Sequence, residues 1–182
     1  MKKYILSLLL LSCMIASHTW AAAPDFEIPE MKIYANAEEC KADNELVAKI
    51  SQYLFTTELP EDAAYARSAI SFVTSWVQAS DEILISLSEQ TTGHFFSCDP
   101  NLSIILLGTY ICGCTRYNRE VLTSKEFTFE MHYYALEATL RYYEKNNKFL
   151  GQCKKMDKML KSLHKGKLRK EQERLFAVSV KD

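Results

Sequence analysis

The stretch Lys125–Lys145, KEFTFEMHYYALEATLRYYEK, decides the fold class of this chain. Its apolar side chains recur every three to four residues along two stripes, which is the period of an α-helix. The stripes consist of Phe127, Met131, Tyr134, Ala135, Ala138 and Tyr142, and of Phe129, Tyr133, Leu136, Leu140 and Tyr143. Thr123 and Glu126 have capping-box spacing and predict the start of this helix. A helix that is apolar over most of its circumference is typical of the middle of a bundle.

Helical signals also extend toward the N-terminus. Helices are predicted to begin at Asn36, at Pro60 and at Pro100, each next to a polar cap or a proline that favours a first turn. The last of these is an apolar helix that runs to Cys114. The segment Asp81–Glu89 fits either a short helix or a strand, and we expect a helix there.

On the C-terminal side, Asn146 and Asn147 predict a break, followed by a last amphipathic helix that ends at Gly166. Its apolar stripe comprises Phe149, Leu150, Cys153, Met156, Leu160 and Leu163. The sequence therefore predicts an all-α, single-domain helical bundle of about five to six helices over residues 37–182. An extended lead-in over residues 22–36 precedes it.

The first 21 residues have the layout of a secretory signal peptide. Lys2 and Lys3 precede an apolar run, and cleavage after Ala21 leaves small residues at the two key positions. The alternative is lipidation of Cys13, which follows Leu10-Leu11-Ser12 and loosely resembles a lipobox. We expect a periplasmic or secreted protein, or an outer-membrane lipoprotein if Cys13 is lipidated.

The charges are unevenly distributed although the net charge is only −1. Residues 22–140 carry 7 basic and 18 acidic side chains, whereas residues 141–182 carry 13 basic and 5 acidic ones. The basic part could bind an anionic lipid or polymer. Alternatively it packs against the acidic part of its own fold, and we favour this interpretation because the two charges are opposite. No nucleic-acid partner is expected.

Five cysteines follow the signal peptide: Cys40, Cys98, Cys112, Cys114 and Cys153. In an exported protein they favour disulfides, and their odd number leaves at least one unpaired. If Pro100–Cys114 is one helix, Cys98 and Cys112 are roughly 20 Å apart and cannot pair. An alternative is that Cys112 and Cys114 form a reducible pair for thiol-disulfide exchange.

Other chemistry has little support in the sequence. His94, Cys98, Cys112 and Cys114 could supply a zinc ligand set, but their spacing matches no zinc motif and the predicted helix separates them. No metal and no cofactor is expected. The carboxylates of Glu126, Glu130 and Glu137 lie on a narrow polar ribbon of the central helix, which is typical of a solvated helix face.

Four tyrosines of the central helix are the candidate ligand-binding residues: Tyr133, Tyr134, Tyr142 and Tyr143. Their rings could line a groove because the hydroxyl tolerates a wet edge, or all four could pack inside with bonded hydroxyls. The leading hypothesis is an exported, non-enzymatic domain that acts through contacts with an unknown protein or small ligand.

One resemblance concerns the order of three features. The stretch Ser75–Asp81, SWVQASD, is followed by the tyrosine-rich helix and then by Lys165-Gly166-Lys167-Leu168. This order, behind a signal peptide, resembles small exported helical proteins of Gram-negative bacteria that carry no assigned activity. The resemblance implies an exported all-helical fold and no site residues.

Overall fold

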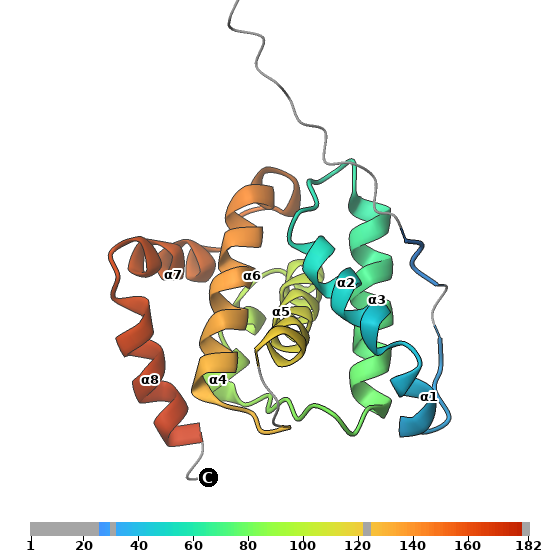
Figure 1. The fold of residues 1–182 in the computed structure, drawn as a ribbon. Coiled ribbons are helices and arrows are strands. Elements are labelled where there is room, and N and C mark those ends of the chain that lie inside the picture. Colours follow the sequence, from blue (N-terminus) through green and yellow to red (C-terminus); the bar gives the residue numbers. More distant parts are fainter. Residues whose placement is uncertain (1–25, 30–31, 122–124, 180–182) are drawn as a thin grey trace, which may run out of the picture.

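The structure, a computed structural model, describes residues 26–29, 32–121 and 125–179 (Figure 1). Its α-helices in these parts are α1 (Ala37–Lys41), α2 (Asn44–Leu54), α3 (Ala63–Ala79), α4 (Glu89–Thr92), α5 (Pro100–Glu120), α6 (Phe129–Leu150), α7 (Lys154–His164) and α8 (Leu168–Ser179). A 3₁₀ helix, η1 (Phe95–Ser97), lies between α4 and α5. These described residues contain no strand, so the all-α prediction is confirmed.

α5 and α6 pack side by side at the centre of the bundle (Figure 1). Tyr110 of α5 and Leu136 and Leu140 of α6 are fully buried between them and their neighbours. Gly113 lets the two backbones approach closely, because a Cβ at this position would lie 2.9 Å from the Cα of Ala135. The central place predicted for the tyrosine-rich helix is confirmed.

α2 and α3 cover the other side of α5. Each turns an apolar stripe toward it, and the buried members are Val47, Ile50, Leu54, Ala66, Ala69, Phe72, Val73 and Trp76. The indole Nε1 of Trp76 donates to the carbonyl of Cys40 at 3.0 Å, which attaches α1 to α3. This half therefore follows from ordinary amphipathic patterning.

α7, the turn 165–167 and α8 form what we call the C-terminal arm, which lies against α6 on the side away from α3 (Figure 1). Gly166 has φ +65° and ends α7, as predicted. The prediction that helical structure ends there is wrong, because the chain reverses and continues as α8. Leu168 and Gln172 are buried and hold α8 in place. The sequence did not predict α8 as an amphipathic helix, because one of these buried residues is a polar glutamine with charged neighbours.

Of the two helix starts predicted at prolines, one agrees with the structure and one does not. Asp99 caps α5 and accepts a hydrogen bond from the N–H of Asn101, so the start at Pro100 is confirmed, although the helix continues past Cys114. The start at Pro60 is wrong, because α3 begins at Ala63. The carboxylate of Asp62 accepts the N–H of Glu58, which holds the residues around Pro60 in a loop.

The helix predicted from Asn36 is divided. Asn36 caps α1 by accepting the N–H of Glu39, as its spacing predicts. A second helix, α2, begins after Asp43, whose carboxylate accepts hydrogen bonds from Lys32 and Tyr34 of the lead-in. Because these contacts come from residues outside the helix, the local sequence pattern does not predict the division into two helices.

The short helix predicted over Asp81–Glu89 is wrong. The chain is irregular as far as Ser88, which caps the one-turn α4. Ile83 points into the core, and the N–H of Leu84 donates to the carbonyl of Lys125. A backbone bond to a distant segment replaces the helical bond here.

Both predicted ends of the central helix are displaced. It begins at Phe129 with Thr128 as its cap, and Thr123 lies outside the described residues. No break occurs at Asn146 and Asn147. The Asn146 side chain accepts the N–H of Leu59 at 2.9 Å and donates to the carbonyl of Tyr142, so a residue with low helix propensity is stabilised inside α6.

The predicted signal peptide, its cleavage after Ala21 and the lipidation alternative at Cys13 all lie outside the described residues. Residues 26–29 and 32–35 are not helical, in agreement with the predicted lead-in. None of the helices in the part of the chain that the structure describes has both the length and the hydropathy of a membrane span.

Candidate functional site

An open cleft of about 700 Å³ lies between α4 and η1 on one side and the C-terminal arm on the other. Cavities of this volume hold small-molecule ligands in other proteins. Its floor includes the buried side chains of His94 and Gln172, and Met159 supplies part of its apolar surface. It is larger than a neighbouring cleft of about 420 Å³ that Leu87, Phe96 and Leu107 help to line.

α7 turns one face to this cleft. Lys155, Lys158 and Ser162 are spaced by three and four residues and therefore share a helix face. The turn at Gly166 brings α8 back alongside, so that Lys165 and Lys167 reach the same cleft. α7 and the segment that follows it in the chain thus both line the cleft.

Positive charge predominates in the cleft. Five lysines line it: Lys155, Lys158, Lys161, Lys165 and Lys167. The acidic side chains beside them are Glu89 and Glu171. No carboxylate of the described residues forms a salt bridge with any of these five ammonium groups. All five are exposed.

Two polar atoms in the cleft wall lack hydrogen-bond partners among the described residues: Nε2 of His94 and Oγ of Ser162. His94 is 8% exposed and packs on the ring of Phe95. The pKa of His94 is lowered to about 3, mainly by burial and also by the neighbouring His132 and Lys155. The imidazole is therefore neutral at neutral pH, and an unpaired buried polar atom costs roughly 1–3 kcal/mol.

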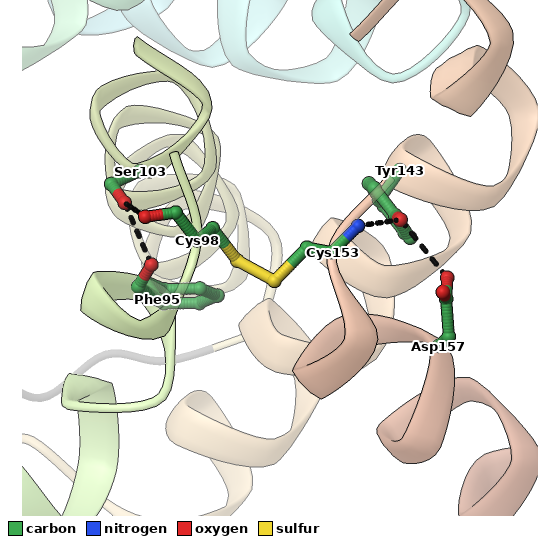
Figure 2. The surroundings of a disulfide bond; sticks show 6 residues. All are labelled: Phe95, Cys98, Ser103, Tyr143, Cys153 and Asp157. Carbon is green, nitrogen blue, oxygen red and sulfur yellow. Dashed lines mark hydrogen bonds between the residues drawn. A yellow bond between two sulfur atoms is a disulfide. The ribbon is translucent and has the colours of Figure 1, made fainter. Parts of the chain in front are cut away.

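A disulfide fastens one end of the cleft. Cys98, directly after η1, is bonded to Cys153, directly before α7, with their Cα atoms 5.3 Å apart (Figure 2). The hydroxyl of Tyr143 accepts the N–H of Cys153 at 2.8 Å and donates to Asp157 at 3.0 Å. Ser103 donates to the carbonyl of Phe95 on the other side of the bond. The covalent bond and its neighbours thus hold η1 next to α7.

A buried chain of hydrogen bonds fastens α8. The hydroxyl of Tyr110 lies 2.8 Å from Nδ1 of His132, and Nε2 of His132 lies 3.3 Å from Oε1 of Gln172. Burial lowers the pKa of His132 to about 4, so the ring is neutral. A neutral ring protonated on Nε2 satisfies both contacts, with Tyr110 donating and Gln172 accepting.

The predicted redox pair lies elsewhere. Cys112 and Cys114 are unpaired and fully buried within α5, and burial raises the pKa of both thiols. Gly113 between them serves the close packing of α5 on Ala135. The geometry brings no accessible thiolate to this motif, which thiol-disulfide exchange requires.

The four candidate tyrosines do not form one groove. Tyr142 and Tyr143 are buried, and their hydroxyls contact Thr57, Asp157 and the backbone of Cys153. Tyr134 packs beside Tyr117 with Arg116 over its ring. Tyr133 instead lies on Phe129 beneath Arg169. The structure therefore spreads them over different faces of α6.

The zinc set considered from the sequence is not assembled either. Cys98 is in the disulfide, and Cys112 and Cys114 are inside α5. Within the described ranges, no group of three or more His, Cys, Asp or Glu side chains could hold a metal ion.

The basic C-terminal part divides into two sets. Lys145 and Arg169 pair with Glu58 and Glu130, as expected if the two halves neutralise each other. The cleft lysines form the second set, and the charge pattern of the sequence does not distinguish them from the first. Their spacing on α7 was the available signal, but only the fold shows that this face borders a cleft.

No protein-family model, curated protein or solved structure matches this chain.

Proposed function

We propose that this chain is an exported, non-enzymatic binding domain and that its ligand occupies the cleft between α4, η1 and the C-terminal arm. One observation carries the proposal: the residues that line the cleft include His94 and Ser162, each with an enclosed polar atom that has no hydrogen-bond partner among the described residues. A ligand toward which these side chains rotate removes the cost of leaving them unpaired. The Cys98–Cys153 bond supports it by holding the walls in place.

Thiol-disulfide exchange through Cys112 and Cys114 is the alternative function. Nothing in the geometry favours it, because both thiols are buried and carry raised pKa values. Alkylation of the native protein distinguishes the two functions. We expect no modification of either cysteine before unfolding, whereas rapid modification of both would favour exchange.

The binding proposal is tested by recording amide NMR spectra of the mature chain with a fragment library of anionic, neutral and cationic compounds. We expect shifts confined to α4, η1, α7 and α8 for at least one class. Ser97→Trp places a bulky ring at an exposed position of the cleft and should abolish these shifts. Ser68→Trp, exposed on α3, is the matched control and should leave them unchanged.

Two results would contradict the proposal. One is a library in which no compound shifts the cleft amides. The other is binding that survives Ser97→Trp with shifts mapped to a different surface.

Export is part of the proposal and needs its own test. The disulfide is typical of an oxidising compartment and supports export. Mass spectrometry of protein from an exporting bacterial host should find Ala22 at the mature N-terminus. A lipidated Cys13 would instead place the protein on a membrane, and an uncleaved cytosolic chain would contradict export.

A further inference from the structure

We infer that the cleft binds a phosphate group, an inference that rests on the proposed binding function. The group could belong to a soluble phosphate ester or to a phospholipid headgroup. Its recognition elements are the five lysines of the cleft wall and the unpaired polar atoms of His94 and Ser162.

The placement of the lysines on α7 supports an anionic ligand. Lys155 lies in the first turn of α7, where the helix dipole disfavours positive charge. Lys161 lies in its last turn, where the dipole is favourable. A bound anion compensates the unfavourable charge of Lys155 and the excess of positive charge in the cleft.

The basic residues of the cleft are compatible with a phosphate group. All five basic residues of the cleft are lysines, and the arginine nearest to the cleft wall in sequence, Arg169, pairs with Glu130. The compact ammonium of lysine is a point charge that binds phosphate oxygens. Several ammonium groups around one cleft match a ligand with several equivalent oxygens.

The neutral groups complete this donor set. His94 is uncharged, so its Nε2 can carry a proton and donate it in a hydrogen bond. The Ser162 hydroxyl is a second donor, on the opposite wall. Glu89 and Glu171 reduce the positive charge without cancelling it.

The test measures the dissociation constant of glycerol 3-phosphate by NMR titration of the mature, disulfide-bonded protein, with glycerol as the uncharged comparison. We expect glycerol 3-phosphate to shift the cleft amides and glycerol to leave them unchanged. Raising the salt concentration should weaken the binding because the lysines are exposed.

The variant Lys158→Gln/Lys161→Gln should weaken binding at least tenfold. The matched control is Lys154→Gln/Lys170→Gln, which removes two exposed lysines of the same arm that do not line the cleft. It should change the affinity by less than twofold. An equal loss in both variants would overturn the inference, because it would mean that only the overall charge matters.

Sedimentation with vesicles distinguishes the two sources of the phosphate. Binding to phosphatidylglycerol vesicles but not to phosphatidylcholine vesicles indicates a lipid headgroup, and binding of glycerol 3-phosphate alone indicates a soluble ester. If neither phosphate probe binds while neutral or cationic fragments still shift the cleft amides, the phosphate inference fails and the proposed binding function stands. If no probe of any class binds the cleft, both fail.

Discussion

The central pair α5–α6 and the C-terminal arm are neighbours in the fold but are held in place in different ways. Large apolar and aromatic side chains such as Leu136, Leu140 and Tyr110 fill the space around α5 and α6. The arm relies on one disulfide, one buried hydrogen-bond chain through His132 and a few apolar contacts. Close packing leaves no room for a ligand, whereas attachment at a few points leaves a cleft between the attached parts.

The largest expected effect is the loss of stability at low pH that the two buried histidines cause. His94 and His132 have pKa values of about 3 and 4 in the folded chain, because of burial, against about 6.5 when unfolded. Below pH 6.5 the unfolded chain takes up protons that the folded chain does not, so stability is present above that pH and is lost as pH falls. Between pH 7 and pH 5 the loss is roughly 2 kcal/mol for each histidine.

Urea unfolding at pH 7, 6 and 5 measures this loss. His132→Asn removes one of the two titrating groups and should halve the pH dependence, whatever its effect on stability at pH 7. A free energy of unfolding that is equal at pH 7 and pH 5 would contradict the buried, neutral state of both rings.

Removal of the disulfide should affect the arm selectively. Cys98→Ser/Cys153→Ser opens a loop of 55 residues and should lower the free energy of unfolding by about 4 kcal/mol. Hydrogen exchange should accelerate more in α7 and α8 than in α5 and α6. The wild-type chain under reducing conditions should behave like the variant. Uniform acceleration across all helices would mean that the arm and the core unfold as one unit.

The same substitution in each region gives the sharpest comparison of packing. Leu136 in α6 is 0% exposed and Leu175 in α8 is 43% exposed. Leu136→Ala should cost about 3 kcal/mol, since it leaves a cavity, and Leu175→Ala less than about 1 kcal/mol. Chemical denaturation measures both. Equal costs would show that the arm is packed as tightly as the core.

The smallest effect is expected at the ion pair between the two regions. Glu130 of α6 pairs with Arg169 of α8, and both side chains are about half exposed. Glu130→Ala should therefore change stability by about half a kcal/mol or less. A loss above about 1.5 kcal/mol would show that this pair, rather than the disulfide and His132, anchors α8.

The elements that could be predicted are those with strong local signals. The stripes of α6, the cap at Asp99 and the turn at Gly166 each depend on residues a few positions apart. The predictions failed where distant contacts override local preference. Asn146 stays helical because it accepts the N–H of Leu59, and Ile83 leaves a helix-like pattern to enter the core.

The candidate site shows the same division. The lysines of residues 141–182 were visible as a charge excess, and His94 was visible as a single titratable residue. Neither pattern indicates a cleft, because its walls come from α4, η1, α7 and α8, and the turn after α7 decides that they face each other. The number of tyrosines in α6 led to the prediction that they bind a ligand, but Tyr142 and Tyr143 are buried in the core.

By itself the sequence determined the helical class, the central position of α6, the capped starts of α1 and α5 and the end of α7 at Gly166. These depend on the 3.6-residue period and on capping bonds between near neighbours, which act over one or two turns. Only the tertiary structure decided that Cys98 pairs with Cys153, that Cys112 and Cys114 are enclosed, and that the lysines of α7 face His94 across a cleft. Each of these joins residues that are remote along the chain, and such a contact exists only after the helices have packed.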